Sequence, residues 1–195
     1  NILEKISVPD TVETVNYEGF LSGTETAISL HGTVHFNTNA SNYGVFRDSP
    51  YLEYLRMPEF AATMSTQTVS DLQYMFAECS QGTANGLEVI FPTNMHKLGN
   101  FAFAFTKVKD GIMILPEGLD EIGGAAFQDS NIVTLDMPST TATISYQILF
   151  NSTTVTTVIC RATTPPALNA SAFNDITATG WSIYVPDASV ATYKA

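Results

Sequence analysis

The chain has 195 residues, of which 45% are hydrophobic, so it is long enough to bury a sizeable core. Charged residues make up only 14% of the chain, the net charge is -11, and the eight Lys and Arg residues are scattered. Such a surface would repel a phosphate backbone, which argues against nucleic acid as a partner. No apolar run reaches the roughly 18 residues that span a bilayer, so we expect no membrane insertion of this segment.

The first 45 residues show weak repetition. Residues 6–8, followed by Pro9, have the form of a strand end, and residues 27–36 alternate as one strand would. We expect residues 1–45 to form an N-terminal capping or irregular region built from a degenerate repeat, because the end units of a solenoid must shield the stack from water. A separate small domain is the alternative. The strand-like start at Asn1 also suggests that an export signal precedes this segment.

A repeat is visible from residue 46 onward. Its scheme is an apolar residue, Gly, two spacers, Ala-Phe, a polar turn and a short alternating strand that ends in Pro, as from Ile122 to Pro138. Arg161 stands where one unit should have its Pro. Six units are marked by a recurring phenylalanine, and the successive spacings are 30, 27, 24, 23 and 23 residues: Phe46, Phe76, Phe103, Phe127, Phe150 and Phe173.

This period lies in the range of leucine-rich repeats, in which each unit supplies one short strand and a return segment. The sequence therefore predicts a repeat solenoid over residues 46–195, a stack of short parallel strands with turn or short-helix returns, in about six units. Because side chains alternate along a strand, the residues one and three before each Pro should point inward with the phenylalanines. These inward pairs are Leu55 and Met57, Val89 and Phe91, Met113 and Leu115, Leu135 and Met137, Val158 and Cys160, and Ile183 and Val185.

The units with Ile-Gly-x-x-Ala-Phe, a strand and Pro resemble the BspA-like leucine-rich repeats of bacterial surface proteins. The tail from Cys160 through Phe173 to Lys194 resembles their terminal unit especially closely. The resemblance covers residues 46–195 well and residues 1–45 poorly, and the long units between Phe46 and Pro92 depart from it. It implies an exported bacterial protein displayed on the cell surface, often through an upstream lipid anchor, with members that bind host or matrix proteins.

If the solenoid has a binding face, it should be made by strand residues that point outward, two positions before each Pro or its equivalent. An exposed row with several apolar members would be unusual for a monomer and would mark a contact surface. Alternatively, return segments cover the row, or the register differs by one residue. The candidate contact residues are Arg56, Ile90, Ile114, Asp136, Ile159 and Tyr184, with Ser7 at the same position near the N-terminus.

Residue types that bind metals or form disulfides are few. His31 and His35 would share a face of a helix and could then bind zinc, but the residues around them favour a strand, so we expect no metal. Cys79 and Cys160 belong to units three repeats apart, which places them roughly 15 Å from each other. We therefore expect both to be small buried apolar residues.

Catalytic patterns are also weak. The carboxylates of Glu117, Asp120 and Glu121 cluster near turns and are interpreted as a solvated edge, because a solenoid offers few deep clefts. We expect no catalytic residues and no cofactor. The leading hypothesis is an extracellular, non-catalytic adhesion or recognition module that binds an unidentified host or matrix protein or glycan. The alternative is a structural spacer or self-assembly module of a surface protein.

Overall fold

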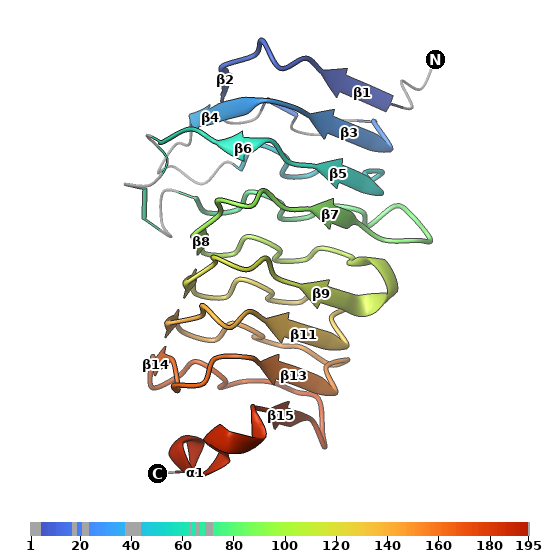
Figure 1. The fold of residues 1–195 in the computed structure, drawn as a ribbon. Coiled ribbons are helices and arrows are strands. Elements are labelled where there is room, and N and C mark those ends of the chain that lie inside the picture. The colour runs from blue at the N-terminus through green and yellow to red at the C-terminus, as the bar shows by residue number, and fades with distance from the viewer. Residues whose placement is uncertain are drawn as a thin grey trace.

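The chain folds into a stack of coils, as seen in a computed structural model that describes residues 5–16, 19–20, 24–37, 44–62, 64, 67–68 and 72–194. Figure 1 shows the strands of one side lying above one another from β1 near the N-terminus to β15 near the C-terminus. Each coil contributes short parallel strands and turns, with little helix. The predicted repeat solenoid is confirmed.

Two four-stranded parallel sheets form the first side of the stack. One sheet contains β1 (Lys5–Val8), β3 (Ala27–Leu30), β5 (Tyr54–Arg56) and β7 (Glu88–Ile90). The other contains β9 (Ile112–Ile114), β11 (Thr134–Met137), β13 (Thr157–Cys160) and β15 (Ser182–Tyr184).

Two further parallel sheets form the second side, beyond the corner at which the first-side strands end. Their strands are β2 (Thr14–Asn16), β4 (Thr33–Asn37) and β6 (Glu59–Phe60) in one sheet, and β8 (Lys97–Leu98), β10 (Glu121–Ile122), β12 (Thr143–Ile144) and β14 (Ala167–Leu168) in the other. Three short helical segments complete the described elements: η2 (Lys109–Gly111), η3 (Asp187–Ser189) and α1 (Val190–Tyr193).

A third side consists of turns joined from coil to coil by backbone hydrogen bonds, such as Phe103 N–H to the Ala126 carbonyl at 2.7 Å. Its turns carry residues with a left-handed backbone, often two in a coil such as Ala125 and Asp129, and these residues also include Asn151 and Asp175. Asp and Asn tolerate this conformation better than most other residues. This tolerance explains the polar residues that follow the recurring phenylalanine.

The interior matches the predicted alternation. Eight of the predicted inward residues are buried: Leu55, Met57, Met113, Leu115, Leu135, Met137, Val158 and Cys160. Val89 and Phe91 are only half-buried but pack against the core. Ile183 is exposed because it lies in the last coil, where no further strand covers it.

The phenylalanines form a continuous stack in the centre of the solenoid. Ring centroids are 5.9 Å apart between Phe46 and Phe76, 4.6 Å between Phe76 and Phe103, and 5.8 Å between Phe103 and Phe127. Offset stacking at these distances adds to the stability gained from burial alone.

The expectation that Phe150 continues this stack is wrong. β10 and β12 pair with Ile122 opposite Ile144, so the residue equivalent to Phe127 is Leu149, which is fully buried. Phe150 lies one position later and is half-buried. The even spacing of the phenylalanines concealed two coils of unequal length, since 22 residues lead from Ile122 to Ile144 and 24 lead from Ile144 to Leu168.

The N-terminal region shares the sheet and the core of the later coils. β3 pairs in parallel with β5, and the Phe36 ring contacts the rings of Phe46 and Phe60. The predicted single strand over residues 27–36 is in fact two strands, β3 and β4, on different sides of the coil. The chain turns between them at Gly32, whose φ of +73° favours glycine. The division at residue 45 remains a proposal, because residues 38–43 lie outside the described part.

The first side is interrupted between β7 and β9, a gap that we call the seam. In the described residues a single parallel bridge, Leu87 to Val108, crosses it. The chain needs five residues from Val108 to Met113 because it turns through η2, whereas the next coil needs three from Ile132 to Leu135. Figure 1 shows β9 lying further from β7 than neighbouring strands lie from each other.

Candidate functional site

The predicted outward residues lie in register along the first side. Arg56 pairs with Ile90, and beyond the seam Ile114, Asp136, Ile159 and Tyr184 occupy successive paired positions. The row also contains Ser7 and Ser29, which pair with each other. Ser29 was missed because Leu30 is followed by His31 and Gly32 instead of Pro, although the alternation of residues 27–30 marked the strand.

The two halves of this row differ in polarity. Ser7, Ser29 and Arg56 make the N-terminal half polar. In the C-terminal half Ile114 is 63% exposed, Tyr184 is 59% exposed and Ile159 is half-buried. We call Ile90, Ile114, Ile159 and Tyr184 the apolar row. Exposed Ile112 lies on the same face of β9 as Ile114, so apolar side chains cluster over that strand.

Asp136 does not present an open carboxylate, contrary to its predicted place as a contact residue. It is 6% exposed because the Arg161 guanidinium donates to both of its oxygens, at 2.7 and 2.6 Å. This hydrogen bonding raises the pKa of Arg161. The departure from Pro at position 161 therefore has a structural role, since it places a cation across the middle of the apolar row.

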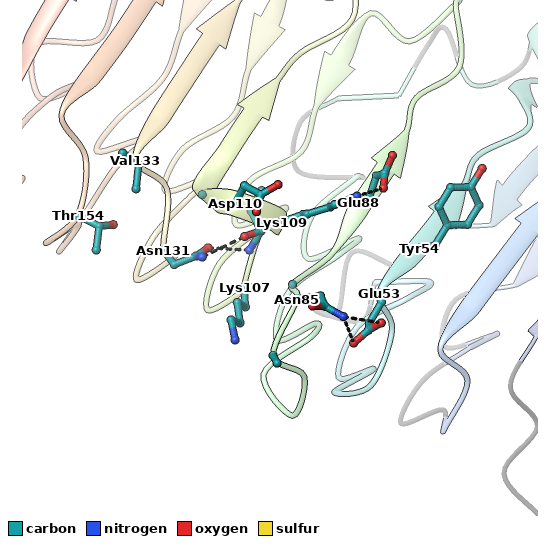
Figure 2. A pocket seen from close by; sticks show the side chains of 14 residues that line it. Glu53, Tyr54, Asn85, Glu88, Lys107, Lys109, Asp110, Asn131, Val133 and Thr154 are labelled. Atoms are coloured by element: carbon teal, nitrogen blue, oxygen red, sulfur yellow. Dashed lines mark hydrogen bonds and ion pairs between the residues drawn. The ribbon is translucent and has the colours of Figure 1, made fainter.

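An open pocket of about 670 Å³ adjoins the row at the edge where the strands of the first side begin. Figure 2 shows its side chains coming from the turns that lead into β5, β7 and β9. Lys109 Nζ lies 2.6 Å from a Glu88 oxygen, and this hydrogen bond raises the pKa of Lys109. Asn85 donates to both Glu53 oxygens at 3.2 Å. Glu53 and Glu88 thus interact with an amide and an ammonium group, respectively.

The polar residues singled out for chemistry are dispersed over the coils. In the described part of the chain no group of three His, Cys, Asp or Glu residues could hold a metal ion. His31 lies exposed at the corner between β3 and β4, whereas His35 is half-buried within β4. The carboxylates of the predicted solvated edge have partners in adjacent coils: Glu117 accepts from Ser139, Asp120 lies 4.0 Å from His96, and Glu121 lies 3.5 Å from Lys97.

Both cysteines are free and buried, as expected. Burial raises the pKa of the Cys79 thiol to about 12, and its Sγ donates to the Phe46 carbonyl at 3.0 Å. A thiol that stays protonated is a poor nucleophile. Cys160 Sγ lies 3.2 Å from the Tyr193 hydroxyl, which in turn donates to the Ala162 carbonyl. These contacts hold α1 against the end of β13.

A stack of coils whose short parallel strands alternate inward and outward side chains is the architecture of a leucine-rich-repeat solenoid. The family model described as BspA type leucine rich repeat region matches residues 1–110 and 72–188, and the chain belongs to this family. The match reaches further toward the N-terminus than the motifs of residues 46–195. A search of curated proteins finds no match to this chain.

Membership of the family gives a coarse functional class. Leucine-rich repeats of this kind are generally non-catalytic and are typical of bacterial surface proteins. Among the described residues, no helix has the length and apolar character needed to cross a bilayer.

Proposed function

We propose that this chain is a non-catalytic recognition module, displayed outside a bacterial cell, that binds a protein through the apolar row. The observation that carries the proposal is the cluster of exposed isoleucines and Tyr184 on one sheet side. Such clusters mark contact surfaces because water exposure of adjoining apolar side chains is unfavourable.

A protein suits this surface better than nucleic acid or a highly polar glycan. The chain carries a net charge of -11, which opposes binding to phosphate. Isoleucine offers neither a ring face nor a hydrogen-bonding group, and Tyr184 is the single aromatic member of the row. Protein interfaces are enriched in aromatic residues and Arg, so Tyr184 and the Arg161 side chain above Asp136 also suit a protein ligand.

The test is binding of the purified chain to a panel of immobilised extracellular matrix proteins and surface glycans. The double substitution Ile114→Asp with Tyr184→Asp should weaken binding to a matrix protein at least about tenfold, since charges would be buried in the contact. Leu168→Asp is the matched control, because Leu168 is equally exposed but lies on the second side.

Each other outcome counts against the proposal. Equal losses in both variants would show that the row is not the contact surface. Binding to glycans alone would contradict a protein ligand. Concentration-dependent oligomers that the row substitutions abolish, without any ligand in the panel, would support self-assembly in place of recognition; sedimentation of the same variants measures this.

A further inference from the structure

We infer that the seam is a docking site for one extended peptide strand of a partner protein, which would insert parallel between β7 and β9. This inference rests on the proposed function, protein binding, and specifies where and how one segment of the partner is held. It concerns main-chain groups inside the first side, whereas the apolar row concerns side chains on its surface.

The main-chain groups at the seam face the gap from both strands. In a parallel ladder, alternate residues direct their N–H and C=O groups to opposite neighbours. Glu88 N–H donates to the Glu53 carbonyl and Ile90 C=O accepts from Met57, so the Val89 groups face the seam. Beyond the seam Leu115 N–H donates to Asp136, so the Ile114 groups face back toward β7.

The register of the two edges fits one inserted strand. In both sheets the outward residues bond toward the preceding strand and the inward residues toward the following one. Val89 is an inward residue of β7 and Ile114 is an outward residue of β9. The N–H and C=O groups that face the seam are therefore those with which a parallel strand between β7 and β9 would pair. β7 and β9 end their respective sheets, and the described residues include no ladder between them. Figure 1 shows the corresponding widening.

The core is also incompletely covered at this level. Inward residues of the other interior first-side strands, such as Leu55 and Leu135, are fully buried, whereas Val89 and Phe91 are half-buried. A groove of about 320 Å³ between the strands is lined by these two side chains together with Met113 and Ile114. An apolar residue pointing inward from the docked strand would cover them, which is favourable in proportion to the apolar area removed from water.

The charges of the pocket beside the seam favour one orientation of the peptide and a basic residue at its amino-terminal end. A parallel strand would begin at the pocket of Figure 2, where three carboxylates, those of Glu53, Glu88 and Asp110, outnumber the ammonium groups of Lys107 and Lys109. Lys109 is paired with Glu88, which leaves a net negative rim. A Lys or Arg at the amino-terminal end of the strand suits this rim. The fitting ligand is an extended segment with a basic start and alternating apolar residues.

Amide hydrogen exchange of the free protein tests the open seam without any ligand. The Val89 and Ile114 amides should exchange at least about tenfold faster than those of Glu88 and Leu115, which are hydrogen-bonded neighbours in the same strands. Equal protection at all four positions would show a closed seam and overturn the inference, while leaving the proposed role of the apolar row intact.

A labelled, acetylated heptapeptide of the sequence Lys-Thr-Val-Thr-Val-Thr-Val tests docking directly by fluorescence anisotropy. Binding should protect the Val89 and Ile114 amides and weaken at least about tenfold when alternate peptide nitrogens are methylated, because methylation removes ladder donors. Val89→Trp, which fills the groove, should abolish binding, whereas Leu168→Asp, which lies exposed on the second side, should not. Equal binding of the methylated peptide overturns the inference. If Val89→Trp fails to fold, the protection pattern and the methylated peptide decide.

Discussion

The two sheets of the first side have the same interior but different exteriors. Inward positions of β3, β5, β11 and β13 are all filled by buried apolar residues. Outward positions are Ser and Arg from β1 to β5, and mainly Ile and Tyr from β7 to β15. The inward pattern is a condition of folding, since each coil must bury its apolar residues against the next. The outward pattern is not, so its change of character supports the binding role that we propose for the apolar row.

Arg161 sharpens the same contrast. Its guanidinium and the Asp136 carboxylate occupy the one outward position beyond the seam that is polar and buried. The N-terminal sheet presents its polar outward residues to solvent, whereas the C-terminal sheet neutralises its carboxylate beneath a side chain. An ion pair therefore lies between Ile114 and Ile159, and the partner that we propose would have to accommodate it.

The largest loss of stability is expected at the level of the seam, where the first-side strands do not pair. Phe103→Ala should reduce the free energy of unfolding by about 3–5 kcal/mol, because Phe103 stacks on both Phe76 and Phe127 on the side that stays continuous past the seam. Urea denaturation measures this loss. Phe105→Ala is the control: it lies two residues away, is exposed, and should cost less than about 1 kcal/mol. Similar losses would contradict the continuous stack.

Alanine substitutions of two neighbouring residues in the shorter coil, Leu149 and Phe150, test the corrected register. Leu149→Ala should cost about 2–5 kcal/mol, because it leaves a cavity in the core. Phe150→Ala removes a larger but half-buried side chain and should cost less. Urea midpoints of the two variants decide between the assignments, and the reverse order would restore Phe150 to the stack.

Alkaline stability should depend on Cys79. Because burial raises the pKa of its thiol from 9.0 to about 12, the folded state keeps a proton that the unfolded chain releases above pH 9. The Cys79 contribution to stability is therefore complete below pH 9 and declines by about 1.4 kcal/mol per pH unit from there toward pH 12. Urea denaturation between pH 8 and about 10.5 should show a shallower decline for Cys79→Ala than for the matched Cys160→Ala variant. Equal slopes would contradict the prediction.

Substituting Arg161 should show how much the fold is destabilised when the buried Asp136 carboxylate loses its partner. Arg161→Gln lowers the urea midpoint, because the Asp136 carboxylate then loses its bidentate partner. Asp136→Asn in the Arg161→Gln background should recover part of the loss. A double variant less stable than Arg161→Gln alone would show that the carboxylate has another essential partner.

The smallest effect should come from the apolar row. Ile114→Thr is expected to change the free energy of unfolding by no more than about 0.5 kcal/mol, because the side chain is exposed and threonine suits a strand. The same substitution on the inward side of the same strand, Met113→Thr, should cost far more. If Ile114→Thr destabilised the chain comparably, the row would serve the fold instead of a partner.

Much of the architecture could be predicted from the sequence, because the alternation of strand residues and the Pro that ends each strand are local patterns. They identified the inward pairs of β5, β9, β11 and β13 and the outward row from Arg56 to Tyr184. Register within a coil was harder to predict. The phenylalanine spacing favoured Phe150 as the core residue, yet the pairing of Ile122 with Ile144 places Leu149 in the core.

The sequence by itself determined the repeat, the family and the direction in which each strand residue points, since these follow from period and polarity. Only the tertiary structure decided that residues 27–36 turn a corner, that Arg161 covers Asp136, and that the sheet opens between β7 and β9. Those features depend on contacts between residues twenty or more positions apart in the chain, such as Thr14 with His35 and Asp136 with Arg161. Local alternation carries no information about such contacts.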